Sequence, residues 1–188
     1  MSSSLTFSID RLPSPIGSML IVADAEERLR ALDWDDHESR MRAALALLYA
    51  PRGIQLREGR APRPIRHALE EYLEGRLEAL DDIPVETAGT RFQLEVWRAL
   101  RRIRPGTTLT YRALALAVGR PDAVRAVALA NGANPISVVV PCHRVIGSNG
   151  SLTGYGGGLH RKRWLLEHEG ALPVQLRMSP HVLATRAS

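Results

Sequence analysis

The sequence contains very little cysteine, and this scarcity excludes several classes of protein. One Cys in 188 residues leaves no room for the internal disulfide framework that stabilises small secreted domains. No apolar run approaches the roughly 20 residues that a membrane-spanning helix needs. The N-terminal segment contains neither the basic region nor the apolar core of a signal peptide. We therefore expect a cytoplasmic protein with no membrane partner.

Lysine is equally scarce, with Lys162 the only one in the sequence. The Arg residues that supply almost all of the basic charge are unevenly distributed. Residues 1–90 contain 11 Arg and 16 acidic residues, whereas residues 91–170 contain 12 basic and 4 acidic residues. The first part has a net charge of −5 and the second a net charge of +8. A basic half joined to an acidic half points to a polyanion such as nucleic acid as its partner. A solvated Arg-rich surface would have the same composition, so charge alone leaves both interpretations open.

The first half of the chain has the pattern of a small α+β domain, which we place at residues 1–86. Alternating apolar residues predict short strands separated by Pro- and Gly-containing turns, and apolar residues at helical spacing predict helices. The predicted strands are 5–11, 17–23, 29–34 and 83–85, and the predicted helices are 37–48 and 65–74. We expect a sheet of antiparallel character. The acidic run that includes Asp33 and Asp35-Asp36 is interpreted as solvated surface.

The second half, residues 87–170, is predicted to be a mainly helical domain. Thr90 and Gln93 fit a capping box, in which each side chain satisfies a free amide at the start of a helix. Behind this domain, residues 171–188 have little periodicity and are predicted to form an extended tail.

Two further helices follow closely in the second half. Thr110 is expected to cap a helix at 111–118, Gly119-Arg120 to turn the chain, and Pro121 to begin a helix that ends near residue 130. A helix, a tight turn and a second helix form the helix-turn-helix pattern of many DNA-binding proteins. Many helical hairpins that bind nothing share this pattern.

The only cysteine, Cys142, lies directly before His143. A β-branched run at 136–141 predicts a buried strand that leads into Cys142, and a glycine-rich loop at 147–158 follows. A thiolate is the reactive form of cysteine, and a neighbouring imidazole is its usual proton acceptor. Because adjacent side chains in an extended chain point to opposite faces, we expect the two groups to communicate through a water or a bend. A small core cysteine beside an unrelated His would have the same sequence, so the pair alone leaves catalysis open.

The pair belongs to a series of motifs: Asn134-Pro135-Ile136, Pro141-Cys142-His143-Arg144-Val145-Ile146-Gly147, Gly154-Tyr155-Gly156-Gly157-Gly158 and Leu165-Leu166-Glu167-His168-Glu169-Gly170. These motifs resemble those of the O6-alkylguanine-DNA alkyltransferase family. The resemblance covers at least residues 90–170 and extends more loosely to the first half. It implies a ribonuclease H-like N-terminal domain and a helical DNA-binding domain. It also implies a single-turnover repair protein that moves an alkyl group from O6-alkylguanine, or O4-alkylthymine, to its own cysteine without a cofactor.

The resemblance implies a role in the reaction for each of five residues. Cys142 would accept the alkyl group, and His143 would deprotonate it through a bound water. Glu169 would orient His143, Tyr111 would donate a proton to the departing guanine, and Asn134 would brace the turn before the active-site strand. The thioether product has no leaving group and no hydrolytic route back, so each molecule would act once.

The resemblance also implies how DNA is bound. The helix-turn-helix would enter the minor groove, and the damaged base would be flipped out of the stack into a pocket. Arg125 would fill the gap that the base leaves. Further DNA contacts are expected at Thr110, Arg120, Ala126 and Asn131. The pocket is expected to be lined by Val145, Tyr155, Gly156 and Gly157. The expected partner is double-stranded DNA containing alkylated guanine, bound by a monomer.

Two departures from the family pattern change these expectations. Some relatives have Ser where Gly156 stands, so its absence should widen the pocket and admit alkyl groups larger than methyl. Some relatives hold zinc with Cys and His in the N-terminal domain, but Cys142 is the only cysteine, so we expect no metal. Two other functions are alternatives: a protein that binds alkylated guanine without reacting, which the presence of Cys142 disfavours, and a cysteine hydrolase, which would need repeated turnover.

Overall fold

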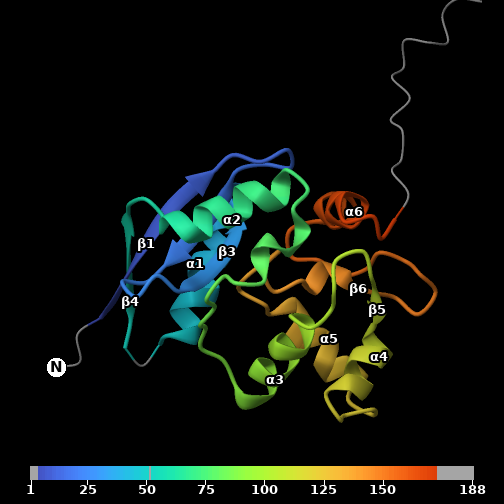
Figure 1. Cartoon of the computed structure of the whole chain (residues 1–188). Helices are drawn as coiled ribbons and strands as arrows, with labels where there is room; N and C mark the ends of the chain where they lie inside the picture. The colour runs from blue at the N-terminus through green and yellow to red at the C-terminus, as the bar shows by residue number, and fades with distance from the viewer. Residues whose placement is uncertain (1–3, 51, 173–188) are drawn as a thin grey trace, which may run out of the picture.

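The chain folds into two halves that pack against each other, one built on a sheet and the other on helices (Figure 1). The computed structural model describes residues 4–50 and 52–172. Of the tail predicted at 171–188, all but the first two residues lie outside these ranges. None of the helices within these ranges is long and apolar enough to cross a membrane.

The first half contains a four-stranded sheet in the order β3-β2-β1-β4. Strands β1 (Leu5–Leu12), β2 (Met19–Ala23) and β3 (Leu29–Trp34) form the predicted antiparallel meander. The sequence pattern did not reveal β4 (Ile54–Glu58), a short edge strand with only two apolar residues. It pairs with β1 in parallel, so the sheet is mixed and not antiparallel throughout.

Helices cover both faces of this sheet. On one face α1 (Glu38–Leu48) packs through Leu45, and on the other α2 (Arg63–Leu73) packs through Leu69. Every residue of β2 and β3 is buried as a result, because alternate side chains that would otherwise face water meet a helix. Each fully buried leucine of this kind contributes about 1.5–3 kcal/mol to folding.

Two details of the first half differ from the prediction. A short 3-10 helix, Asp35–His37, precedes α1. The strand predicted at 83–85 is only a single bridge between Val85 and Leu29, and it follows another 3-10 helix, Leu77–Leu80. A run of three residues is too short to compete with the turns that flank it.

The caps predicted for the second half are confirmed. At the start of α3 (Arg91–Leu100), Thr90 Oγ1 accepts from the amide of Gln93 at 3.2 Å, and Gln93 Oε1 accepts from the amide of Thr90 at 2.9 Å. Thr110 Oγ1 likewise accepts an amide at the start of α4 (Tyr111–Ala117), at 3.1 Å. Each such cap is worth about 1 kcal/mol.

The predicted helix-turn-helix is formed by α4 and α5 (Val124–Gly132). Pro121 does not begin α5 as expected. It lies in a turn that closes when the amide of Ala123 donates to the carbonyl of Arg120 at 2.9 Å. The turn between the helices is therefore longer than the Gly119-Arg120 pair.

The two halves meet along the free edge of β3. The amide of Leu32 donates to the carbonyl of Pro135 at 3.0 Å, and its carbonyl accepts from the amide of Ser137 at 2.8 Å. The chain just before Cys142 is thus hydrogen-bonded to the sheet of the other half. One continuous hydrophobic core extends from β3 to α6 and includes Cys142.

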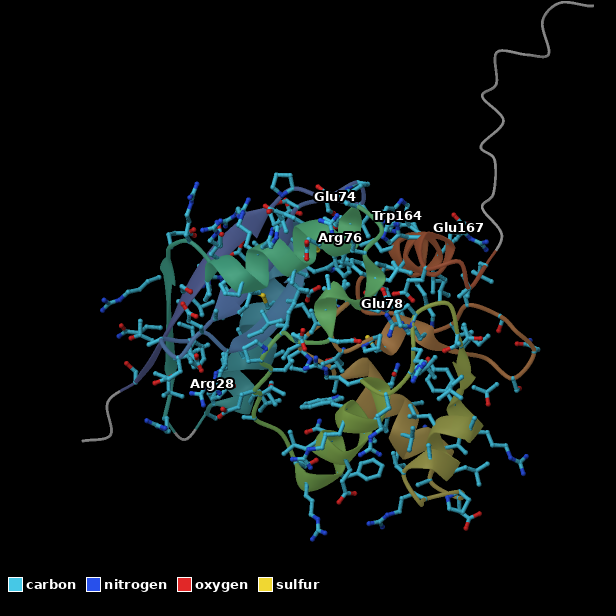
Figure 2. The ribbon with its side chains drawn as sticks, viewed as in Figure 1. Arg28, Glu74, Arg76, Glu78, Trp164 and Glu167 are labelled. Atoms are coloured by element: carbon cyan, nitrogen blue, oxygen red, sulfur yellow. The ribbon has the colours of Figure 1, made fainter. Side chains whose placement is uncertain are left out.

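The last helix, α6 (Leu159–His168), contacts the end of α2. His168 Nε2 donates to the carbonyl of Tyr72 at 2.7 Å, and Trp164 stacks on the His168 ring with 4.7 Å between ring centroids. Figure 2 shows Trp164 on α6 beside the end of α2, where Glu74 lies. The two helices therefore hold the halves together on the side opposite α3.

Candidate active site

The run at 136–141 forms turns and not the predicted strand. Ile136 makes a single bridge to β3. Val138 has a φ of +67°, and the amide of Val139 donates to the carbonyl of Ser137 at 2.7 Å. This geometry is a γ-turn of the rarer, strained kind, and a β-branched residue seldom adopts it. The prediction was wrong because β-branched residues favour strands only where a neighbouring strand supplies a ladder.

A second tight turn places Cys142. Pro141 has φ −80° and ψ 64°, and the amide of Cys142 donates to the carbonyl of Val140 at 2.8 Å. These values are those of an inverse γ-turn. Cys142 is then the first residue of the 3-10 helix Cys142–Arg144, so it stands at a sharp bend instead of at the end of a strand.

Asn134 holds this folded segment together. Its Nδ2 donates to the carbonyl of Val140 at 2.8 Å and to that of Ile136 at 3.2 Å, while its Oδ1 accepts from the amide of Ile136 at 3.0 Å. The same Nδ2 lies 3.2 Å from Sγ of Cys142. The brace expected at Asn134 therefore reaches the reactive sulfur as well as the turn.

The thiol of Cys142 is protected from water. Only 6% of the residue is exposed. Burial raises the pKa of the thiol, and the Asn134 amide and the positive charge of Lys162 oppose that shift only in part. The resting group is therefore a neutral thiol, and its reaction as a nucleophile requires a base.

His143 and Glu169 form a buried pair beside Cys142. His143 Nε2 lies 2.9 Å from Glu169 Oε1, and both side chains are fully buried. The sequence left Glu169 open to interpretation as a solvated charge at a helix end; the structure places it in the core, directly after α6.

Two further side chains hold Glu169, and the sequence analysis missed both. Arg144 donates from Nε to Oε2 at 2.8 Å and from Nη2 to Oε1 at 2.9 Å. Tyr72, which comes from α2 in the other half, donates its hydroxyl to Oε1 at 2.8 Å. Although burial opposes ionisation, His143 and Arg144 hold the pKa of Glu169 well below its usual value. Tyr72 is part of the apolar face of α2, so no sequence signal distinguished it from the rest of the core.

This arrangement determines the protonation of His143. Burial lowers its pKa, against the opposing effect of Glu169, so the ring is neutral at pH 7. Because the carboxylate of Glu169 only accepts hydrogen bonds, we assign the ring proton to Nε2. The lone pair of Nδ1 is buried and has no hydrogen-bond partner among the described residues. His143 is therefore an oriented base with a free nitrogen, and no hydrogen bond links it directly to Cys142 within the described part of the chain.

Cys142 opens into a pocket of about 100 Å³. Elements of both halves contribute to it. Its lining comprises Asp33, Arg40, Met41, Ala44, Asn131, Gly132, Ala133, Asn134, Pro135, Ser137, Cys142, Gly154, Tyr155 and Gly156. The Tyr155 ring packs edge-on against His143, at 6.4 Å between centroids. The thiol of Cys142 thus borders a small cavity whose walls come from both halves of the chain.

The hydroxyl of Tyr111 lies beside Gly154, one of the residues that line this pocket. The short parallel strands β5 (Leu109–Thr110) and β6 (Val145–Ile146) bring the start of α4 beside the segment that follows Cys142. The Tyr111 hydroxyl donates to the carbonyl of Thr153 at 3.3 Å. Burial raises the pKa of Tyr111, so its hydroxyl keeps its proton at neutral pH.

Lys162, which the sequence analysis did not single out, supports the pocket from α6. Its Nζ donates to the carbonyl of Val145 at 2.6 Å and to that of Thr153 at 2.7 Å. Burial lowers its pKa to about 8.

Gly157, which follows Gly156 in the glycine-rich loop, has no room for a side chain, because a Cβ there would fall on the ring of Trp34.

The residues expected to bind DNA divide into two groups. Arg120, Arg125 and Ala126 are exposed around the start of α5, where a duplex could reach them. Thr110 is partly buried as the cap of α4. Asn131 is 2% exposed and lines the Cys142 pocket instead of the outer surface.

Acidic residues near the pocket also differ from expectation. Asp33 was interpreted as solvated surface, but it is 6% exposed and bonded to Arg40. Asp36 is exposed but pairs with Arg161 at 3.0 Å. No group of His, Cys, Asp and Glu side chains within the described ranges has the arrangement of a metal site.

Both halves of the chain match one family. Residues 10–87 match "6-O-methylguanine DNA methyltransferase, ribonuclease-like domain", and residues 91–171 match "6-O-methylguanine DNA methyltransferase, DNA binding domain". The methylated-DNA–protein-cysteine methyltransferase of Salmonella typhimurium is 47% identical over 163 residues, which cover 87% of this chain and 95% of that protein. The protein of the same name from Methanosarcina barkeri is 40% identical over 160 residues, 85% of this chain and 95% of that one.

Solved structures agree with this match. The crystal structure of Mycobacterium tuberculosis O6-methylguanine methyltransferase has a TM-score of 0.68 and 35% identity, with 89% of this chain and 93% of that chain covered. The structure of the M. tuberculosis protein in complex with DNA has a TM-score of 0.66 and 36% identity, with coverage of 89% and 94%.

Proposed function

The chain belongs to the 6-O-methylguanine DNA methyltransferase family, and on this premise we propose that Cys142 is the residue that accepts the alkyl group. Members of the family move an alkyl group from O6 of guanine in DNA to one of their own cysteines, and this chain has a single cysteine. The observation that carries the assignment is the site itself: a buried thiol at the base of a small pocket, next to a neutral and oriented imidazole.

The reaction begins with a proton transfer. Nδ1 of His143 takes the proton of the thiol, and a bound water relays it because no direct bond joins the two side chains. The imidazolium that forms is stabilised by Glu169, whose carboxylate is held ionised by Arg144. The transient positive charge on the ring thus has a fixed negative partner 2.9 Å away.

The alkyl transfer follows. Sγ of Cys142 attacks the alkyl carbon in line with the bond to O6, so that the C–S bond forms as the C–O bond breaks and the electron pair remains on guanine. Tyr111 gives guanine the proton it needs as a leaving group, and its raised pKa keeps that proton available. The proton held by His143 returns to the phenol through solvent. The thioether cannot be hydrolysed, so one molecule acts once.

DNA is bound by the helix-turn-helix in the minor groove. Arg125 and Arg120 lie exposed around α5 in the basic half of the chain, where they suit contact with a duplex. Ala126 is small enough for close approach to the groove floor, and Arg125 takes the place of the flipped base. Thr110 orients the start of α4, and Asn131 contributes to the pocket for the extruded base.

The pocket roles rest on the resemblance to the family, since Tyr155 and Gly156 line the cavity whereas Val145 and Gly157 are not among its lining residues. Tyr155 lies against the base, and the backbone at Gly156 and Gly157 forms the outer wall. The carbonyls of Cys142 and Val145 receive the exocyclic amine of guanine. We also propose a cytoplasmic location, which the requirement for a reduced thiol supports.

An intact-mass measurement tests this function. The protein is incubated with duplex DNA that contains one O6-methylguanine, and we expect a gain of one methyl group on Cys142 with loss of the lesion. The variant Cys142→Ser should bind without gaining mass. Binding by the wild-type protein without any mass change would support a non-reacting sensor, and several lesions repaired per molecule would support a hydrolase. The same assay with O4-methylthymine tests the second substrate.

A further inference from the structure

Arg40 reaches from the first half of the chain to the wall of the Cys142 pocket. It lies on α1, and its Nη1 donates to the carbonyl of Gly156, 116 residues further along the chain. Its Nη2 donates to both carboxylate oxygens of Asp33 at 2.7 Å. Arg40, Asp33 and Gly156 all line the pocket together with Cys142. The guanidinium is therefore part of the boundary of the space that the alkyl group enters.

The Arg40 guanidinium occupies the space beside Gly156 that a side chain at this position would otherwise fill. A Cβ at this position would fall on the Arg40 guanidinium. The φ of Gly156 is not positive, so the backbone itself does not require glycine. Part of the space that we expected Gly156 to leave open is therefore occupied by Arg40. A second side chain, from the other half of the molecule, fills the vacated space.

A buried carboxylate fixes the position of Arg40. The Arg40 side chain is 43% exposed, whereas that of Asp33 is 8% exposed. Asp33 has no ionic partner other than Arg40 within the described residues, and it also accepts from the amide of Trp34 at 3.0 Å. Arg40 can therefore leave the Gly156 carbonyl only by disturbing its bond to a carboxylate that water does not reach easily.

Resting on the function proposed above, we propose that Arg40, anchored by Asp33, sets the size of the alkyl group that the pocket accepts. A methyl group fits while the guanidinium stays on Gly156. A larger group such as benzyl must displace it, and the cost of leaving Asp33 without its partner then falls on the larger adduct alone. Discrimination between methyl and benzyl adducts then depends on Arg40, which lies in the first half of the chain, whereas the catalytic groups lie in the second half.

The test compares methyl and benzyl transfer in two variants on the same helix. Second-order rate constants for alkylation of Cys142 are measured with O6-methylguanine and O6-benzylguanine, each as the free base and within duplex DNA. For Arg40→Ala we expect the ratio of benzyl to methyl rates to rise about tenfold, the scale on which pockets discriminate by small apolar groups. The matched control is Arg42→Ala, because among the described residues Arg42 pairs with Glu38 alone and does not line the pocket.

A second variant guards against misfolding. Arg40→Ala leaves a buried carboxylate unpaired, so Arg40→Ala combined with Asp33→Asn removes both charges together. The double variant should show the same rise in the ratio and a melting temperature closer to that of the wild type.

Three outcomes would decide against this role or against its premise. An unchanged ratio in both variants would refute a role in selecting size. If Arg40→Ala slowed methyl and benzyl transfer from duplex DNA equally and left the rates with the free bases unchanged, Arg40 would be a phosphate contact and the proposal would be overturned. Failure of the wild-type protein to become methylated at all would refute the proposed function itself, which the first two outcomes leave intact.

Discussion

The hydroxyl of Tyr72 provides a direct test of how the two halves share the active site. Tyr72 is 1% exposed, and its hydroxyl donates to Glu169 Oε1 at 2.8 Å. The change Tyr72→Phe removes this one donor and keeps the ring that packs between α2 and α6. Glu169 retains His143 and Arg144 as partners.

The expected loss of stability depends on the charge of the acceptor, which is the carboxylate of Glu169. A buried hydrogen bond to a charged group contributes about 1.5–3 kcal/mol, against about 0.5–1.5 kcal/mol for a neutral one. For a protein of this size each kcal/mol lowers the melting temperature by about 2–4 °C, so Tyr72→Phe should lower it by about 3–12 °C. The rate of alkyl transfer should change little, because the bond between His143 and Glu169 remains.

The control is a second buried tyrosine in the same half. The Tyr49 hydroxyl makes only long contacts, at 3.4 Å from Arg30 Nη1 and 3.3 Å from the amide of Ala88. Urea unfolding followed by tryptophan fluorescence gives the free energy of unfolding of Tyr72→Phe and Tyr49→Phe under the same conditions. We expect the larger loss for Tyr72→Phe. A loss equal to or smaller than that of Tyr49→Phe would refute the argument that this bond stabilises the joined halves. A large loss of rate at unchanged stability would instead show that Tyr72 acts in the chemical step.

Three other changes test the site. Because burial holds the pKa of His143 below its usual value of 6.5, the fall in the rate of methyl transfer from the free base on acidification should be centred below pH 6.5; a fall centred at or above 6.5 would contradict this. Glu169→Gln should slow transfer and cost about 3–5 kcal/mol at pH 7, because Arg144 is left as a buried charge. Because folding depresses the pKa of Glu169, its carboxylate stabilises the fold at pH values above its unfolded pKa near 4.5, and this stabilisation is lost as pH falls below that value. The free energy of unfolding in urea should therefore change less with pH below 4.5 for Glu169→Gln than for the wild type. An equal pH dependence of the two proteins would contradict this. Arg125→Ala should reduce repair of duplex DNA by about tenfold while free O6-benzylguanine reacts at the wild-type rate, since a finger in the duplex contributes only when DNA is present; equal losses would rule out that role.

Much of the fold was predictable because local signals agreed with the tertiary structure. The bounds of β3 and the capping box at Thr90 follow from patterns of a few adjacent residues. The parallel pairing of β4 with β1 depends on a contact about 50 residues apart along the chain, from Leu5 to Ile54. A five-residue edge strand with only two apolar residues contains no local signal for such a partner.

The residues of the candidate site likewise comprise some that the sequence identified and some that it did not. Cys142, His143 and Glu169 were identified because they belong to motifs of contiguous residues, and the structure brings them together. Tyr72 and Arg40 could not be identified, because each is an ordinary helix residue whose role appears only when the other half packs against it.

The turns before Cys142 show why the β-branched run predicted the wrong structure while still being suited to the right one. A positive φ at Val138 costs about 1–3 kcal/mol. Val138, Val139 and Val140 are 2%, 4% and 3% exposed, and burial of each contributes about 1.5–3 kcal/mol. Packing of three valines therefore exceeds the strain of one turn, and Asn134 satisfies the Ile136 and Val140 carbonyls that a sheet would otherwise have paired. β3 forms hydrogen bonds only with the first residues of the run, so the residues after them can bend. This bend places Sγ of Cys142 beside Asn134 at the pocket.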